Sequence, residues 1–517
     1  MEKIKKQNNY LSALANIYVL LIGVGLPLVV RNRYFDILTV KYYYYCACTI
    51  FLVVFVTMYG IIVKPKLIAS YIKQNSIKAI TSKLTISDYA VIIFWAIAVV
   101  STFSSDYIFE SFWGNEGRLT GLFLINWYVL SYFCVSKLWK FKKSYFDIIL
   151  GAGILVCLFG ITDYFKMDIF KFKAPMLAEQ RAIFTSTIGN INTYTAYVCI
   201  IMAMSTVLFA LSKDLKHSVY YFVSMVVSFF AIIMGVSDNA YLSLASLFIV
   251  LPLFLLNSKA GIQKYLVIIA TFFSVIQCVD WINKSFRNSV LGIDSAFEML
   301  VSFSGLHIFV ISLWTVFIIW KIIDSRMLNI DKQYGRIFKY LWVIILGIVL
   351  IGITYITFDI NVANDSSKYG KLNNYLLFND DWGTHRGYIW RNAIENFLQL
   401  SIWKKIVGFG PETFGILLLQ KTANNPYNEL FDNAHNEYLH LLITVGFAGL
   451  MSYLVFIVTV VKKCLCNKNR NPYLIAVAIS VICYSVQAFV NLNLPITGPI
   501  FWLLIGIGAN KSIYQQK

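Results

Sequence analysis

The chain has 517 residues, of which 58% are hydrophobic, 16% aromatic and only 14% charged, and its formal net charge is +18. Soluble domains usually carry about 25% charged residues, so this composition excludes an ordinary soluble protein. A basic chain can bind nucleic acid when its charges form one face of a soluble domain. Here the basic residues stand between apolar runs, so we expect no nucleic-acid partner.

Apolar runs long enough to cross a bilayer recur along the chain. A membrane-spanning helix needs about 20 such residues, and this criterion predicts about fourteen spans. They lie near residues 11–30, 42–63, 88–103, 120–137, 146–163, 191–212, 218–236, 240–257, 262–279, 301–321, 338–357, 439–461, 472–491 and 496–510. The first run is too long for the apolar core of a signal peptide and lacks a small-residue cleavage site, so we interpret it as a span.

Lysine and arginine fall unevenly between these spans. If the N-terminus is cytoplasmic and the sides alternate, every inner loop carries at least two basic residues and the acidic residues gather in the outer loops. Loops rich in lysine and arginine face the cytoplasm. We therefore expect a multi-pass plasma membrane protein with both termini in the cytoplasm, and we interpret the net charge of +18 mainly as a signature of topology.

One long polar insert interrupts the spans. It divides the chain into residues 1–357, with spans and short outer loops, the insert 358–438, and residues 439–517, with the last three spans. In the predicted topology the insert lies outside the cell. The expected fold is thus an all-α polytopic membrane protein of about 12–14 transmembrane helices with a large extracytoplasmic helical loop before the last three spans.

The insert itself predicts two helices and a turn. Residues 385–400 form a helix with Arg386 and Trp390 on one face and an apolar side made of Tyr388, Ile389, Phe397 and Leu398. Residues 408–411 read Gly-Phe-Gly-Pro and predict a turn. A further helix begins near Asn433 and continues into the next span, which would place His435 and Leu439 on one face.

His435 is the first candidate for a catalytic residue. It precedes a span at the outer interface, next to acidic and amide side chains. A histidine with an ordinary pKa near 6.5 can accept a proton from a hydroxyl group. A histidine at this depth also serves as a helix cap or contacts lipid headgroups, and position alone favours that second interpretation.

Four arginines fall on the predicted outer side, where basic residues are otherwise sparse. They are Arg118, Arg181, Arg386 and Arg391. The guanidinium fork suits the oxygens of a diphosphate, but each arginine taken singly fits headgroup contact or ion pairing better. Glu412, which follows a Gly-Pro turn, is open to either interpretation.

Several motifs of other enzyme classes are missing from the sequence. Asp380-Asp381 is not a D-x-D metal pair, and there is no Walker loop, no H-E-x-x-H and no G-x-S-x-G. Most of the nine cysteines lie in apolar runs, and Cys464-x-Cys466 lacks the spacing of a zinc site. ATP-driven transport and zinc hydrolysis lose most of their support, and we expect no metal and no other cofactor.

Several short motifs together resemble the O-antigen ligase and O-antigen polymerase family. The motifs are Arg386-x-x-x-Trp390, Gly408-Phe409-Gly410-Pro411, His435-Asn436-x-x-Leu439, Gly446-x-x-Gly449-Leu450, Gly117-Arg118-x-x-Gly121 and the segment from Arg181 that includes Gly189-Asn190-x-Asn192. The family consists of bacterial membrane glycosyltransferases with a large external loop, of the GT-C type. One departure is the outer turn Ser237-Asp238-Asn239, where the family often has Ser-Arg.

The resemblance implies transfer of a glycan from an undecaprenyl-diphosphate carrier to a hydroxyl of an acceptor sugar or glycolipid, with inversion at the anomeric carbon. His435 would act as the general base, and Arg386, with Arg118 and Arg181, would hold the diphosphate. Further substrate contacts fall to Glu412, Asn436 and Trp390. The partners would be this donor, the acceptor and membrane lipids; the oligomeric state is not indicated.

Three functions therefore stay open. The first is a surface polysaccharide ligase or polymerase, two activities that share a donor site and differ in the acceptor. The second is a flippase or similar transporter of lipid-linked oligosaccharides, which would place ionisable residues within its spans; here such residues gather outside. The third is a structural partner in an envelope-assembly complex, with the insert as a docking domain.

Overall fold

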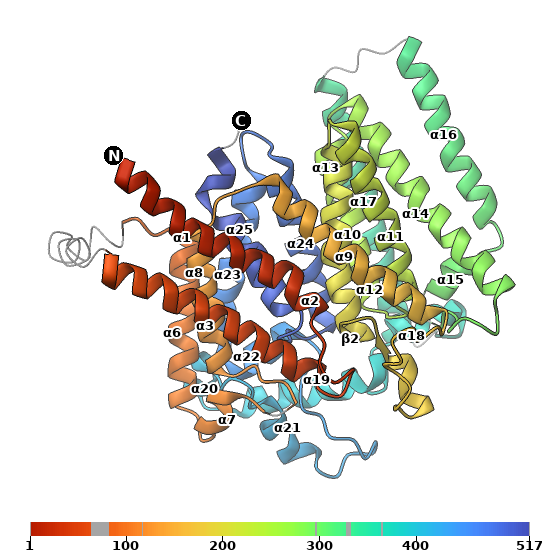
Figure 1. Cartoon of the computed structure of the whole chain (residues 1–517). Coiled ribbons are helices and arrows are strands. Elements are labelled where there is room, and N and C mark those ends of the chain that lie inside the picture. Colours follow the sequence, from red (N-terminus) through yellow and green to blue (C-terminus); the bar gives the residue numbers. More distant parts are fainter. Residues whose placement is uncertain are drawn as a thin grey trace.

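The computed structural model describes residues 2–63, 82–115, 117–294, 297–326, 332–362 and 366–515. The protein is an all-α polytopic membrane protein, which confirms the predicted fold class (Figure 1). Among the described residues the only strands are β1 (Phe184–Thr185) and β2 (Gly189–Asn190), which pair antiparallel in the loop between residues 164 and 191.

The helices up to the insert form most of the bundle. In chain order they are α1 (Glu2–Leu20), η1 (Leu21–Gly25), α2 (Leu26–Leu28), α3 (Ile37–Val63), α6 (Ile86–Phe103), α7 (Ile108–Trp113), α8 (Leu122–Leu138), α9 (Lys143–Tyr164), η2 (Ala178–Ile183), α10 (Ile191–Leu211), α11 (Leu215–Met234), α12 (Ala240–Val250), α13 (Pro252–Leu255), α14 (Lys259–Ser285), α15 (Phe297–Val301), α16 (Leu306–Arg326) and α17 (Lys332–Asn361).

The insert and the C-terminal part contain the remaining helices. These are η3 (Ser366–Leu372), α18 (Asn373–Leu376), α19 (Trp382–Gln399), α20 (Ile402–Val407), α21 (Phe414–Thr422), α22 (Glu437–Thr444), α23 (Gly446–Leu465), α24 (Pro472–Gln487), η4 (Ala488–Val490), α25 (Gly498–Ala509) and η5 (Lys511–Gln515). In Figure 1 the helices α19 to α22 lie at the lower end of the bundle and both termini lie at the upper end.

Eleven helices in the described part of the chain are long and apolar enough to cross a membrane, and three shorter apolar helices are Leu122–Leu138, Ala240–Leu255 and Gly498–Ala509. Each of the fourteen predicted ranges overlaps one of these helices. Pro252 interrupts the second of these three, between the end of α12 and the start of α13, because proline lacks the N–H that would continue the preceding helix.

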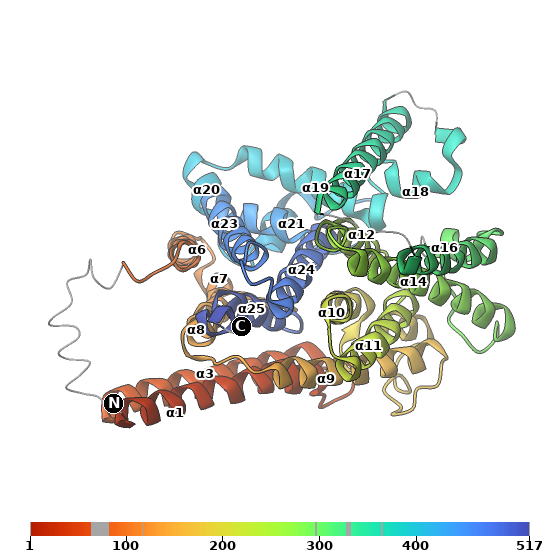
Figure 2. The same ribbon diagram turned by 90° about the horizontal axis from the view of Figure 1, so that it is seen from above.

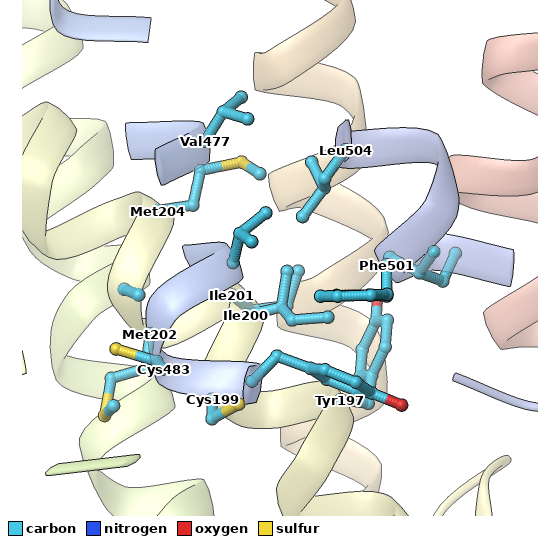
Figure 3. Close-up of a cluster of buried hydrophobic side chains, with 14 of the residues drawn as sticks. Tyr197, Cys199, Ile200, Ile201, Met202, Met204, Val477, Cys483, Phe501 and Leu504 are labelled. Carbon is cyan, nitrogen blue, oxygen red and sulfur yellow. The ribbon is translucent and has the colours of Figure 1, made fainter. Parts of the chain in front are cut away.

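The helix α10 is the centre of the bundle. Within its most apolar window 94% of the residues are buried, against none in α17, and it packs against α11 and α24. Figure 3 shows side chains of α10, among them Ile201 and Met204, against Val477 of α24 and Phe501 of α25. Since lipid is as apolar as these side chains, close van der Waals packing rather than the hydrophobic effect holds such helices together.

The peripheral helices surround this centre. Seen from above, α1 and α3 run along one edge of the bundle, and α16 and α17 lie on the far side of α12 and α14 (Figure 2). Their exposed apolar side chains, such as Ile311, Val349 and Ile351, fit contact with lipid tails. Within the insert, α20 packs against the central helices α6 and α23, whereas η3 and α18 pack against the peripheral helix α17.

We expect Trp502→Ala to lower the thermal stability of the protein. Trp502 is 2% exposed and its ring packs against Phe94, Tyr128 and Phe456, so truncation leaves a cavity; for soluble cores such changes cost about 3–5 kcal/mol. The measurement is the melting temperature of the purified protein in detergent. The matched control is Trp281→Ala, whose ring is 58% exposed; equal losses in both variants would contradict the packing argument.

Candidate functional site

His435 lies in a tight turn just before a helix. Its φ is 45°, a left-handed conformation that is uncommon outside glycine, and its backbone N–H donates to Asn433 Oδ1 at 2.9 Å. Asn436 then caps α22, since its Oδ1 accepts from the backbone N–H groups of Tyr438 and Leu439 at 3.0 Å each. The prediction that His435 shares a helix face with Leu439 is wrong, because His435 precedes the cap residue.

The same helix corrects a second prediction. We expected one helix from near Asn433 into the next span, but α22 ends at Thr444 and α23 begins at Gly446, whose φ is 76°. A Cβ at Gly446 would lie 2.3 Å from the carbonyl oxygen of Ile406. The break lets α20 and the segment after it approach the end of α22.

An ion pair joins the loop after α7 to the His435 loop. Arg118 donates to both carboxylate oxygens of Asp432, from Nε to Oδ2 and from Nη2 to Oδ1, at 3.1 Å each. Burial by itself raises the pKa of Asp432, but the hydrogen bonds and charge of Arg118 hold it below its ordinary value. Two segments 314 residues apart in the sequence are therefore held together next to His435.

A cavity of about 410 Å³ opens at this junction. Arg118 and His435 line it, together with Asn190, Asn192 and Asn491. The amides are tied to one another, since Asn190 Oδ1 accepts from the Asn192 N–H at 2.8 Å and Asn491 Nδ2 donates to the Asn192 carbonyl at 3.0 Å. The cavity, which we call the upper cavity, thus combines a base, a cation and a fixed set of amides.

The charges of two arginines lower the pKa of His435. Burial is the main reason that the pKa of His435 falls to about 4, and the positive charges of Arg386 and Arg118 lower it further, while Asp432 opposes them. Arg386, in α19, is itself partly buried, and Asp238 from the turn between α11 and α12 counters the effect of burial on its pKa. At neutral pH His435 is therefore an uncharged imidazole near two arginine cations, of which Arg118 lines the upper cavity and Arg386 does not.

A second cavity, of about 80 Å³, lies beside the first and is lined by Glu412, Glu437 and His440; Arg118 lines both. We call it the lower cavity. Glu412 is 3% exposed, and it accepts hydrogen bonds from Asn115 Nδ2 at 2.9 Å and from the Thr120 hydroxyl. Burial raises its pKa to about 7. His440 Nε2 lies 3.8 Å from Glu412 Oε2, and burial lowers the pKa of this histidine to about 4.

Of the other residues singled out from the sequence, one contacts the His435 loop and two are bound elsewhere. Trp390 supports the site from α19, because its Nε1 donates to the Ala434 carbonyl at 2.8 Å and so holds the residue before His435. Arg181 does not line either cavity; its guanidinium donates to the carbonyls of Met176 and Ala174 in its own exposed loop. Arg391 pairs with Asp380 on the exposed side of α19.

The predicted helix at residues 385–400 forms as α19, with a non-helical start at residues 383–385, so its regular part begins at Arg386. Ile389 is buried, and Tyr388 and Phe397 pack against the same small core, as predicted. Leu398 is 64% exposed, so its assignment to the apolar side is wrong. The buried face continues instead through Ala393, one turn after Ile389.

Among the polar residues of the two cavities, sequence reasoning gave no role to Glu437, His440 or Asn491. Glu437 and His440 follow His435 within one turn of α22 and could have been found as neighbouring ionisable groups at helical spacing. Asn491 lies in the stretch from Gln487 to Trp502, which also resembles the family, but its place in the cavity depends on the packing of the chain after α24. No group of three or more His, Cys, Asp or Glu side chains that could hold a metal ion occurs among the residues that the structure describes.

Comparison with known proteins does not assign the chain to a family, because no protein-family model and no curated protein matches it. The chemistry must therefore be argued from the site. A neutral imidazole next to fixed cations can take a proton from a hydroxyl while the cations hold an anionic group, and the amides of the upper cavity can bind other polar atoms of a ligand.

Glu412→Gln should remove one part of the pH dependence of stability. The pKa of Glu412 rises from 4.5 to about 7 on folding, so the stabilisation that the protonated carboxyl provides is complete below pH 4.5 and is lost as the pH rises to about 7. The loss amounts to about 3 kcal/mol. Between pH 5 and pH 8 the melting temperature of Glu412→Gln should fall less than that of the wild type. Glu395→Gln, at an exposed position, should lose as much as the wild type does. Identical curves for wild type and Glu412→Gln would contradict this.

Proposed function

We propose that the protein is a membrane glycosyltransferase that moves a glycan from an undecaprenyl-diphosphate carrier to a hydroxyl of an acceptor sugar or glycolipid. One observation carries the proposal: a neutral histidine, His435, lies at a polar cavity under the influence of two arginines. The resemblance of its motifs to the O-antigen ligase and polymerase family gives the same assignment independently of the geometry.

In the proposed reaction the acceptor hydroxyl attacks the anomeric carbon of the donor. His435 takes the hydroxyl proton as the new C–O bond forms. The bond from the anomeric carbon to the diphosphate breaks, and the diphosphate leaves with the electron pair. Arg118 and Arg386 then face the increased negative charge of the leaving group, and a single displacement inverts the anomeric carbon.

The remaining residues have supporting roles in this proposal. Asp432 fixes the orientation of the Arg118 fork, and Asn436 and Trp390 hold the His435 turn from its two ends. Arg181 has no place in the proposed site, since its guanidinium is bound within its own loop. The proposal also puts the insert outside the plasma membrane and both chain termini in the cytoplasm.

A transporter of lipid-linked oligosaccharides is the second candidate. The feature that favours it is the lower cavity, where the ionisable side chains Glu412, Glu437 and His440 are gathered in the interior. Transporters place such groups along the path of a substrate or proton.

His435→Ala should reduce glycan transfer by about 100-fold or more, because a positioned general base contributes at least that much. The measurement is transfer from a purified lipid-linked donor by the protein in proteoliposomes. His307→Ala, an exposed histidine at the start of α16, is the control and should keep full activity. Unchanged transfer in His435→Ala would rule out this residue as the base; absence of transfer by the wild type, with movement of the donor across the bilayer, would support the transporter.

The same variant in the native host separates the two transferase activities. Surface polysaccharide run on a gel would show shortened chains if the wild-type protein is a polymerase and full-length but unattached chains if it is a ligase.

The pH profile tests the electrostatics of the site. Because the pKa of His435 is held near 4, kcat/KM should stay high at pH 6 and fall only as the pH approaches about 4. Arg386→Gln removes one of the cations that lower this pKa, so the acidic limb of its residual activity should move to higher pH. An acidic limb at the ordinary histidine value of about 6.5 in the wild type would contradict the assignment.

A further inference from the structure

Three asparagines of the upper cavity have no part in the proposed proton transfer. Asn190 caps α10 from the end of β2, Asn192 lies in the first turn of α10, and Asn491 follows η4. All three line the cavity together with His435. We call them the asparagine wall. Asn192 and Asn491 are 299 residues apart in the sequence, so the wall exists only in the folded bundle.

Each asparagine of the wall uses one end of its amide within the protein and leaves the other end free. Asn190 Oδ1 accepts from the Asn192 N–H at 2.8 Å, and Asn192 Oδ1 accepts from the Ser237 hydroxyl at 2.7 Å. Asn491 Nδ2 donates to the Asn192 carbonyl at 3.0 Å. The opposite ends of the three amides have no hydrogen-bond partner among the described residues. The wall therefore offers two NH₂ donors and one carbonyl acceptor in fixed positions.

Phe35 adds an aromatic surface to the same cavity. It lines the cavity and is 64% exposed. The neighbouring Tyr34 is buried, its hydroxyl donates to the Ser186 carbonyl at 2.9 Å, and its ring packs against Phe184. Tyr34 thus anchors this segment of the chain, and the ring of Phe35 stays available to a ligand.

The charged side chains of the cavity are paired within the protein. Among the described residues that line it, only Asp36 and Arg118 carry a charge at neutral pH. Asp36 pairs with Arg31 at 2.7 Å, and Arg118 pairs with Asp432 at 3.1 Å. A ligand at the asparagine wall therefore meets neutral amides and an aromatic ring, which suits an uncharged polar molecule.

We propose that the asparagine wall and Phe35 form a subsite for an uncharged sugar ring. The hydroxyl groups at the edge of such a ring can pair with the free ends of the amides. Its C–H groups can lie on the phenyl ring, whose face is negative. The volume of the cavity, about 410 Å³, lies in the usual range for small-molecule sites of about 300–1,000 Å³. The source of the ring rests on the proposed function: it belongs to the glycan of the donor or to the acceptor.

The test measures binding without transfer, by saturation-transfer difference NMR on the purified full-length protein in lipid nanodiscs. The probes are the methyl glycosides of glucose, galactose and N-acetylglucosamine, and at least one should give a saturable signal with the wild type. Phe35→Ala and Asn192→Asp should each weaken this binding about fivefold, the usual effect of losing one neutral contact. Asn192→Asp keeps the acceptor for Ser237 and removes only the free donor.

Two exposed positions outside the cavity lining provide matched controls. Phe103→Ala and Asn288→Asp make the same chemical changes there and should bind the glycosides as the wild type does. No signal from any of the three glycosides, or equal weakening in variants and controls, would overturn the subsite. Intact glycoside binding by a wild type that performs no transfer would support the subsite and contradict only the proposed function.

The transfer assay identifies which substrate supplies the ring. If Phe35→Ala raises KM for the acceptor, the ring belongs to the acceptor; if it raises KM for the lipid-linked donor, the ring belongs to the donor glycan. The acidic limb of the pH profile should stay in place in this variant, because Phe35 carries no charge. Unchanged KM values for both substrates would contradict the subsite.

Discussion

A close backbone contact at the end of α22 holds the candidate site together. The N–H of Phe409 donates to the Ile443 carbonyl at 2.9 Å, and the N–H of Gly410 donates to the Thr444 carbonyl at 3.0 Å. The last carbonyls of a helix have no partner within it, so the turn caps α22 from outside. A Cβ on Gly408 would lie 2.2 Å from the Thr444 oxygen. Only glycine permits this approach, and the approach brings Glu412 to the loop that carries Arg118.

The spans could be predicted because the signal for a membrane helix is local. Each expected apolar range overlaps a helix, since length and hydropathy alone decide whether a segment can cross a bilayer. The break between Thr444 and Gly446 could not be predicted in this way, because the apolar run is continuous across it. Its cause is tertiary, namely the passage of the chain from Ile406 to Gly408 against the break.

The site could be predicted only as a set of separate residues. Chemistry and the resemblance pointed to His435, Arg118 and Arg386, but their meeting depends on contacts between distant segments, such as the pair of Arg118 with Asp432. The same dependence explains Arg181: its type and its predicted outer position equal those of Arg118, yet its own loop supplies carbonyls that bind its guanidinium. Residue type indicates what a side chain can do, and packing decides what it meets.

The depressed pKa of His435 has a consequence for a ligand at this site. Burial and the charges of Arg386 and Arg118 both disfavour the imidazolium. An anion bound between these arginines would oppose the second effect and raise the pKa of His435 toward its ordinary value. Under the proposed function the histidine would thus be a weak base in the empty site and a stronger one next to a bound diphosphate. The same arginines would then couple binding of the donor to removal of the proton from the acceptor, which is an advantage where water could otherwise take the place of the acceptor.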